Sequence, residues 1–305
     1  MKTTLRIGTR DSKLALWQAN LVKNSLESLG VATRLVPIKS TGDLIQDKPL
    51  YELGVTGVFT KALDIALLNG DIDLAVHSMK DMPTLLPQGL VLAAVLERGN
   101  PHDVLIHKGL DFLNEEGIVA TGSLRRQAQW LHRYPNHEIT DLRGNVQTRL
   151  QKLQDNAWDG ALFAAAGLKR LSLELPQQTV LEWMIPAPAQ GAIAIVISDN
   201  DPELAATLKQ INHRDTEICA HVERAFLRTL EGGCSAPIGA LATINADSLH
   251  FKGVLLSPDG QKRLYLSKEA PIAAYKKIGR HYAQELLSQG GDEIMKEIKV
   301  RLGKS

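Results

Sequence analysis

The sequence predicts an α/β fold of two lobes, in which strands alternate with helices, followed by a small α+β domain. Three observations predict it. Short apolar runs alternate with helix-period segments over the first two thirds of the chain, and three strand-like runs then follow one another between residues 238 and 267. The length of 305 residues also exceeds what one hydrophobic core usually supports, so two or three domains are expected.

The first lobe begins with an alternation of strands and helices. Strands are predicted at residues 5–8, 31–38 and 72–76, with helices at 12–29 and 59–68. The first helix is expected to bury a stripe of Leu14, Trp17, Leu21 and Leu29. This βαβαβ order is typical of a mostly parallel sheet covered by helices. Residues 41–57, rich in glycine and mixed charges, are expected to form a long loop.

The second lobe repeats the alternation. Strands are predicted at residues 104–106, 118–120, 137–142 and 160–165, with helices beginning at Leu124 and Val146. A stiff, proline-containing segment at 185–191 leads into the apolar run 192–197, which is expected to return to the first sheet. The predicted domains are therefore 1–97 with 191–213, then 98–190, and finally 214–305.

The last domain holds the more notable of the two cysteines. A helix is predicted up to about residue 230, strands at 238–244, 249–256 and 262–267, and helices at 273–287 and 292–302. Cys234 follows Gly232 and Gly233 on the loop that enters the first of these strands, whereas Cys219 lies in a helical pattern. A thiol on such a loop is either idle or the site of a covalent attachment, and its local sequence leaves both open.

Composition excludes several classes of function. The formal net charge is +1, so no global basic field predicts binding to nucleic acid or membrane. No metal-ligand spacing, no phosphate-binding glycine motif and no apolar run of membrane-spanning length occurs in the sequence. No metal is therefore expected. Two cysteines and a start without an apolar leader favour a soluble cytoplasmic protein.

Basic residues follow several of the predicted strands. They are Arg10, Lys80, Arg125, Arg126 and Arg143, and Arg149 and Arg170 lie in the same half of the chain. Ligands of open α/β sheets bind beyond the carboxyl ends of the strands, so these cations predict a site for a polyanion that carries carboxylates or phosphates. Solvent-facing charge is the alternative for any single arginine. Arg125 and Arg126 are expected to be exposed, so that replacing either hardly changes stability.

Asp81 is the one carboxylate in this basic setting. It directly follows Lys80 at the end of a predicted strand. An aspartate among cations stays ionised and suits the stabilisation of a positive intermediate or the transfer of a proton. A surface pair with Lys80, or a cap for the next element, is the alternative reading.

The sequence contains several distinctive blocks, which include His77-Ser78-Met79-Lys80-Asp81 and Glu231-Gly232-Gly233-Cys234. Further blocks lie at 9–19, 121–127, 142–146, 166–170 and 188–192. Through these blocks the sequence closely resembles the hydroxymethylbilane synthase family, also called the porphobilinogen deaminase family, over essentially its whole length. Their number and order make a chance match negligible.

The resemblance implies a transferase that condenses four porphobilinogen molecules head to tail into linear hydroxymethylbilane, with release of ammonia, in tetrapyrrole biosynthesis. It implies a dipyrromethane cofactor bound to Cys234 through a thioether, and Asp81 as the catalytic carboxylate. The implied cofactor-binding residues are Arg125, Arg126, Lys80, Ser78, Thr121, Ser123, Arg143 and Arg149. The implied substrate-binding residues are Arg10, Ser12, Gln18, Arg170 and Gln190. Two lobes like those of periplasmic binding proteins, a third domain that bears the cofactor and a monomeric state are also expected.

Two other functions remain as alternatives. A non-enzymatic, two-lobed anion-binding protein would also carry basic strand ends. A thiol-dependent acyl transferase would need a base near Cys234, and no histidine stands close to it in the sequence. The chain also departs from the family in one loop, where Val55-Thr56-Gly57 replaces a common Gly-Lys-Gly, so Thr56 stands in place of a lysine.

Overall fold

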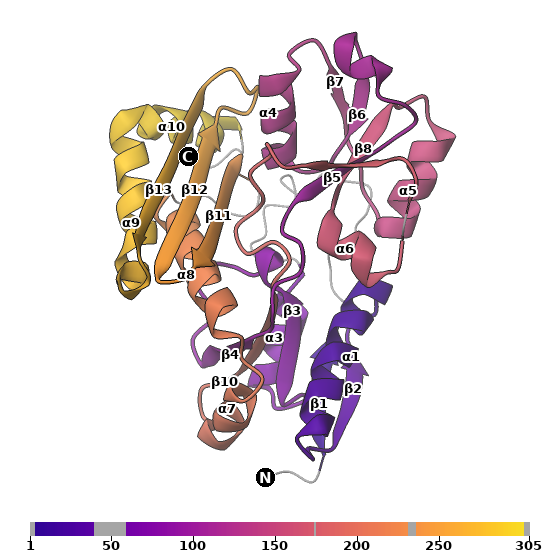
Figure 1. Ribbon diagram of the computed structural model, residues 1–305. Coiled ribbons are helices and arrows are strands. Elements are labelled where there is room, and N and C mark those ends of the chain that lie inside the picture. Colours follow the sequence, from indigo (N-terminus) through magenta and orange to yellow (C-terminus); the bar gives the residue numbers. More distant parts are fainter. Residues whose placement is uncertain (1–3, 40–58, 174, 231–235, 302–305) are drawn as a thin grey trace. The chain divides into compact units, whose positions relative to one another are not determined.

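The computed structural model describes residues 4–39, 59–173, 175–230 and 236–301 (Figure 1). Within them the chain forms two compact units. The first holds the described residues up to Gly99 together with Gly191–Ile218, and the second holds Asn100–Gln190 with the described residues from Cys219 onward. The predicted loop 41–57 and Cys234 lie outside the described residues.

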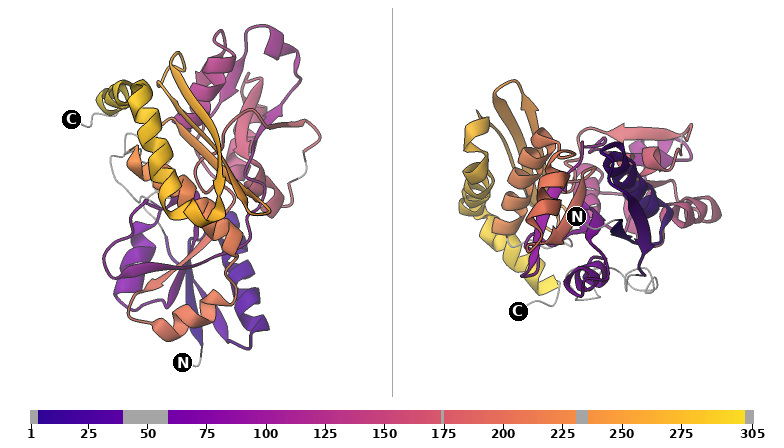
Figure 2. Two further views of the ribbon diagram at one scale, coloured as in Figure 1. Left: turned by 60° about the vertical axis from the view of Figure 1, so that its left-hand side comes forward. Right: turned by 90° about the horizontal axis from the view of Figure 1, so that it is seen from below.

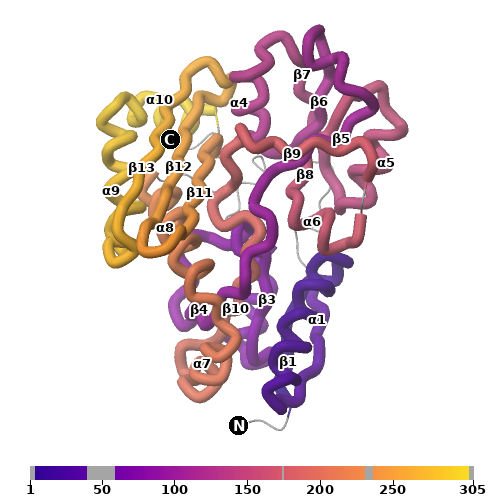
Figure 3. The backbone as a smooth tube through the Cα atoms, viewed as in Figure 1, coloured from indigo at the N-terminus to yellow at the C-terminus, as the bar shows by residue number. Residues whose placement is uncertain are grey.

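The first unit is built on a five-stranded sheet with the order β2-β1-β3-β10-β4. Its strands are β1 (Leu5–Thr9), β2 (Thr33–Pro37), β3 (Leu74–Ser78), β4 (Leu90–Val95) and β10 (Ile193–Ser198). Its helices are α1 (Lys13–Ser28), α3 (Lys61–Leu68), α7 (Pro202–Lys209) and the 3-10 turn Met79–Asp81. β1 pairs in parallel with β2 and β3, whereas β10 runs antiparallel to both of its neighbours. The sheet is thus mixed, because β10 enters it from a distant part of the chain (Figure 3).

Helix α1 buries a different face from the predicted one. Ala15, Ala19, Val22 and Leu26 are buried, and the last three belong to the core that includes strands β1, β3 and β10. Trp17, Leu21 and Leu29 are 39%, 36% and 42% exposed, so the predicted stripe was wrong. Spacings of four, three and four residues put the buried set on one face, and its small side chains let the helix lie close to the sheet.

The second unit contains another five-stranded sheet, with the order β7-β6-β8-β5-β9. Its strands are β5 (Asp103–His107), β6 (Ile118–Ala120), β7 (Glu138–Thr140), β8 (Gly160–Ala164) and β9 (Gln178–Leu181). Its helices are α4 (Leu124–Arg133), α5 (Val146–Asp155), α6 (Ala165–Arg170) and the 3-10 turn Asp111–Asn114. Here again three strands are parallel and the fourth in order, β5, is antiparallel to both neighbours. The two sheets therefore share one order of strand directions, although the antiparallel strand comes last in sequence in the first sheet and first in the second.

The second unit also contains the small α+β domain. Its strands β11 (Ile238–Asn245), β12 (Ser248–Leu256) and β13 (Arg263–Pro271) form an antiparallel sheet. Its helices are α8 (Arg214–Thr229), which begins in the first unit, α9 (Tyr275–Leu286) and α10 (Asp292–Arg301), with short turns at Ile272–Ala274 and Leu287–Gly291.

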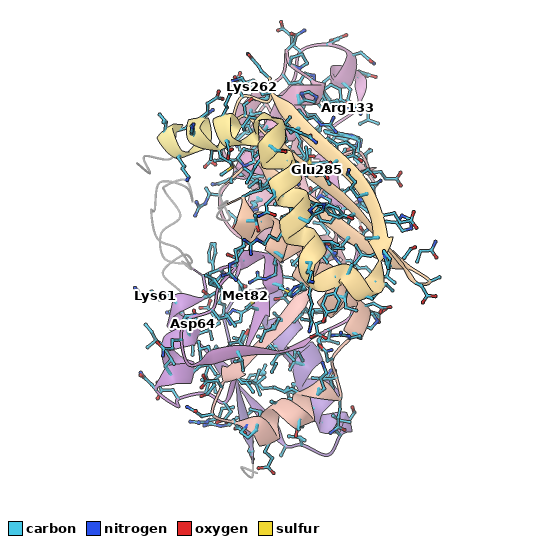
Figure 4. The ribbon with its side chains drawn as sticks, turned by 90° about the vertical axis from the view of Figure 1, so that its left-hand side faces the viewer. Lys61, Asp64, Met82, Arg133, Lys262 and Glu285 are labelled. Carbon is cyan, nitrogen blue, oxygen red and sulfur yellow. The ribbon has the colours of Figure 1, made fainter. Side chains whose placement is uncertain are left out.

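Aromatic side chains pack this sheet against its helices. Helix α9 crosses one face of the sheet (Figure 2). Phe251 of β12 contacts Phe226 of α8 and Tyr282 of α9, with ring centroids 5.1 and 5.4 Å apart. Glu285, which Figure 4 labels on α9, also pairs with Lys268 of β13 at 2.7 Å.

These elements confirm the predicted fold class of two α/β lobes and a small C-terminal α+β domain. The predicted domain boundaries remain a prediction. No helix among the described residues is long and apolar enough to cross a membrane.

Candidate active site

A polar cavity of about 60 Å³ lies at the carboxyl ends of β1 and β3 in the first unit. Five of the predicted site residues line it: Arg10, Ser12, Gln18, Ser78 and Asp81. Arg10 directly follows β1, and Ser78 ends β3. The strand order explains the arrangement, because β1 and β3 are parallel neighbours and their carboxyl ends meet at one edge.

Hydrogen bonds fix three of these side chains. Ser12 caps α1 by accepting the Ala15 N–H at 3.3 Å. Gln18, only 2% exposed, donates from Nε2 to Ser78 Oγ at 2.8 Å. These bonds tie α1 to the end of β3 and thereby set the wall of the cavity.

Asp81 ends the 3-10 turn that follows β3, and it is half-buried. The turn redirects the chain directly after the strand, which places the Asp81 carboxylate at the cavity. Lys80, the middle residue of the turn, is half-buried and is not among the residues that line the cavity.

Phe59 and His77 also line the cavity and were not predicted as site residues from the sequence. The guanidinium of Arg10 lies over the ring of Phe59, with Cζ 4.4 Å from the ring centroid. His77 is 5% exposed, and burial together with the charge of Arg10 lowers its pKa to about 4, so the imidazole is neutral near pH 7. The His77-Ser78-Met79-Lys80-Asp81 block pointed to its neighbours, but nothing in its spacing singled out the histidine.

In the second unit, the loop between β6 and α4 carries Thr121 and Ser123. Thr121 is buried, and its Oγ1 accepts the N–H of Ser123 at 3.2 Å. A Cβ on Gly122 would lie 2.8 Å from the carbonyl oxygen of Leu142, so only glycine lets this loop lie against the segment before Arg143. This close approach brings the loop after β6 next to the segment after β7, and site residues were predicted in both.

Arg125 and Arg126, in the first turn of α4, are 5% and 6% exposed. Arg125 Nη1 lies 2.7 Å from Asp103 Oδ2, and Arg126 Nε lies 2.9 Å from Asp103 Oδ1. The expectation that these arginines are exposed was therefore wrong. The sequence shows no sign of the pairing, because Asp103 stands 22 residues before Arg125 and directly precedes the strand predicted at 104–106.

Asp103 is fully buried, at 0% exposure. Burial alone would raise the pKa of Asp103, but the two guanidiniums and the Gln190 amide outweigh that effect and hold it well below its usual range. Gln190 is 1% exposed and donates to Asp103 Oδ1 at 3.0 Å and to the Pro101 carbonyl at 2.7 Å. The structure thus joins three predicted site residues around one unpredicted carboxylate.

The remaining arginines follow the same sheet. Arg143 is buried, and this burial lowers its pKa although Asp141 opposes the shift. Arg149 Nε donates to the carbonyl of Gly144 at 2.7 Å, beside the Asn145 cap of α5. Arg170 ends α6, and burial lowers its pKa to about 10, so it stays charged near pH 7. Most of these cations are thus buried or half-buried rather than solvated.

Both α/β lobes thus carry cations at or near the ends of their strands. Two family profiles match the chain, "Porphobilinogen deaminase, dipyromethane cofactor binding domain" over residues 5–206 and "Porphobilinogen deaminase, C-terminal domain" over residues 217–288. The chain is 45% identical to the porphobilinogen deaminase of Desulfitobacterium hafniense over 310 residues, covering 99% of each chain. It is 42% identical to that of Pelotomaculum thermopropionicum over 306 residues, covering 98% of each.

The chain therefore belongs to the porphobilinogen deaminase family. This membership confirms the predicted transferase function and the dipyrromethane cofactor, and it does not favour the alternative of a non-enzymatic anion-binding protein. The profile that names the cofactor covers both α/β lobes, which hold the predicted cations.

Among solved structures, the chain is similar to the periplasmic VFT2 domain of Bordetella pertussis BvgS, with 11% identity and a TM-score of 0.42. The match covers 68% of this chain and 86% of that one. A periplasmic binding protein of an arginine transport system from Legionella pneumophila has 14% identity and a TM-score of 0.40, covering 69% and 92%. These likenesses are too weak to support an argument.

Proposed function

We propose that the chain joins four porphobilinogen molecules head to tail into linear hydroxymethylbilane, with Asp81 as catalytic carboxylate and Cys234 as the attachment point of the cofactor. Loss of ammonia from porphobilinogen leaves an electrophilic, positively charged methylene-pyrrolenine. An ionised carboxylate stabilises such a charge where it develops. The position of Asp81 in a polar cavity of the first lobe supports this role.

The observation that carries the proposal is the charge of the Asp103 cluster. Two guanidiniums share one carboxylate, so the buried group keeps one positive charge. Arg125 Nε is buried and has no acceptor among the described residues. Burying an unbalanced charge is costly unless a partner completes it. A carboxylate side chain of a pyrrole ring fits this requirement.

These donors therefore fit a dipyrromethane, whose rings carry acetate and propionate groups. We assign Arg125, Arg126, Arg143 and Arg149, with Thr121, Ser123, Ser78 and Lys80, to binding the cofactor. We assign Arg10, Ser12, Gln18, Arg170 and Gln190 to the substrate and the growing chain. When bound, the cofactor supplies the nucleophilic ring carbon to which the first substrate is joined.

The protein residues have separable tasks in this proposal. The arginines neutralise and orient carboxylates through charge-assisted hydrogen bonds. Gln18 and Ser78 hold the wall of the cavity next to Asp81. Arg10 and Asp81 line the cavity beside the neutral His77, so the cavity offers one cation and one carboxylate to a substrate that carries both signs. A monomeric, cytoplasmic enzyme without nucleic-acid or membrane partners is part of the proposal.

Intact mass spectrometry of the purified protein tests the covalent cofactor. We expect an adduct with the mass of two pyrrole rings and a colour reaction with Ehrlich's reagent. Cys234→Ser should lose the adduct, and Cys219→Ser, the matched control at the other cysteine, should keep it. An adduct that survives Cys234→Ser and disappears with Cys219→Ser would overturn the assignment.

A further inference from the structure

Asp103 connects β5, α4 and the segment that ends at Gln190 through its two carboxylate oxygens. Oδ2 accepts Arg125 Nη1 at 2.7 Å. Oδ1 accepts Arg126 Nε at 2.9 Å and Gln190 Nε2 at 3.0 Å, and Arg126 Nη2 lies 2.8 Å from it. The carboxylate stands at the start of β5, the arginines open α4, and Gln190 ends the segment before β10. Every charged group of the cluster is buried.

Stabilisation of the folded protein does not by itself explain such a cluster. A buried ion pair is often no more stable than apolar residues of similar volume, because two charges must be removed from water. This cluster removes three charges from water and leaves one positive charge unbalanced. The arrangement is therefore better explained by its effect on the orientation and charge of the two guanidiniums.

The bonds leave one side of Arg125 open. Its Nη1 is occupied by Asp103 and by the carbonyl oxygen of Ile185 at 2.8 Å. Its Nε is buried without an acceptor among the described residues. A planar guanidinium held at one Nη can present the opposite edge, Nε and Nη2, to a carboxylate in a bidentate pair. Asp103 thus selects which edge of Arg125 faces a ligand.

Arg126 is held more completely. Its Nε and Nη2 face Asp103, and its Nη1 donates to the carbonyl of Leu162 at 2.8 Å. Burial and the neighbouring Arg125 lower the pKa of Arg126, whereas Asp103 opposes that shift. Asp103 therefore opposes the loss of charge on Arg126 and holds the two adjacent guanidiniums close together.

We propose that Asp103 is a positioning residue of the cofactor site, which fixes Arg125 and Arg126 for a ligand carboxylate, and that Gln190 in turn holds Asp103. Gln190 donates both of its amide hydrogens to protein acceptors, Pro101 and Asp103. These bonds hold the Asp103 carboxylate against the segment that ends at Gln190. This inference rests on the proposed function, because it takes the ligand to be the dipyrromethane.

The test compares Asp103→Asn with Asp103→Glu and with a control, Asp159→Asn. Asp159 belongs to the same lobe, where its carboxylate accepts the backbone N–H of Ile118 at 2.8 Å. Each protein is purified as the full chain, and its melting temperature is measured. Its intact mass is then determined by mass spectrometry after incubation with porphobilinogen. The fraction that carries the two-ring adduct and the KM for porphobilinogen of that fraction are the readouts.

We expect Asp103→Asn to lower the adduct fraction or raise KM by about tenfold to a hundredfold, the equivalent of one charge-assisted hydrogen bond, at temperatures where the melt shows a folded protein. Asp103→Glu, which keeps the charge, should recover most of that loss even with a lower Tm. Asp159→Asn should keep the wild-type adduct fraction and KM.

Gln190→Leu is the second variant, because Asp103→Asn can fail to fold. It keeps every charge and removes the amide that donates to Asp103 and to the Pro101 carbonyl, so we expect a several-fold effect on the same readouts. If either variant is folded and has the adduct fraction and KM of the wild type, Asp103 is not a positioning residue. A wild-type protein that carries no adduct would instead contradict the proposed function, so the two failures are distinguishable.

Discussion

The carboxylate of Glu223 accepts the backbone N–H of Ala189 at 2.6 Å and, with its other oxygen, that of Ala242 at 2.7 Å. Glu223 lies on α8 and is 0% exposed. Ala189 has a φ of 61°, in the left-handed region that a non-glycine residue rarely occupies. The carboxylate thus holds the strained Ala189 directly before Gln190 and connects that segment to β11.

Glu223→Gln should destabilise the protein by about 1–3 kcal/mol, because a carboxamide accepts only one of the two N–H groups and turns its NH₂ toward the other. Urea unfolding measures the change. Glu182→Gln, an exposed change in the same segment, should stay within about 0.5 kcal/mol. Equal effects of the two substitutions would show that the buried bonds contribute nothing.

Arg125→Leu should destabilise the protein by about 3 kcal/mol, in contrast to the small effect expected from the sequence. The substitution removes one of two cations from the buried Asp103 and leaves the Ile185 carbonyl with the Gln129 amide alone. Thermal melts compare it with Arg133→Leu, an exposed arginine in the last turn of the same helix. A loss no larger than that of Arg133→Leu would contradict the structural role.

Local patterns predicted most of the helices and strands, because the residues that define them lie close together in the sequence. The helix predicted to begin at Leu124 does so, and the three C-terminal strands agree with β11, β12 and β13 within a few residues. Apolar alternation, glycine and proline mark such segments without help from the rest of the chain. By contrast, β4, β9 and α7 were not predicted. β9 is short and half polar, and pairing with β5 defines it.

The candidate site was predictable only where a motif was local. Strand-end positions identified Arg10 and Asp81, which the structure places around one cavity. The partner of Arg125 and Arg126 could not be predicted, because Asp103 meets them through the antiparallel placement of β5 beside β8. The burial of these arginines was misjudged for the same reason. A charged side chain is predicted to be exposed unless the sequence also reveals the partner that would pair with it.

His77 predicts a pH dependence of stability. Its pKa is about 4 in the folded protein and about 6.5 in the unfolded chain, because burial and Arg10 disfavour the imidazolium. Between these values the unfolded chain binds a proton that the folded protein lacks, so this contribution is complete above about pH 6.5 and falls as the pH drops toward 4. The loss amounts to about 3 kcal/mol at most.

Urea unfolding of the wild type and of His77→Gln at a series of pH values from 7 to 4.5 checks this expectation. The variant lacks the titrating group, so its stability should fall less over the same range. Asp103, whose pKa lies below the usual range, loses its contribution only at lower pH and does not confuse the comparison. Identical slopes for both proteins would mean that His77 does not titrate as proposed.

Asp81→Asn should lower turnover by about a hundredfold to a thousandfold, the range found when one group that stabilises transition-state charge is removed. The amide keeps the size of the side chain but loses its negative charge. Because the benefit belongs to the transition state, KM should stay close to that of the wild type. Stability should change little, since Asp81 is half-buried at the wall of the cavity.

Single-turnover release of ammonia is the measurement, on protein first shown by mass to carry the two-ring adduct. That check is essential, because a variant that cannot assemble its own cofactor would be inactive for another reason. Asp199→Asn, an exposed aspartate after β10 in the same lobe, is the control and should keep wild-type turnover. If Asp81→Asn instead kept its turnover while KM rose steeply, Asp81 would belong to substrate binding, and the charge that develops on loss of ammonia would need another counter-ion.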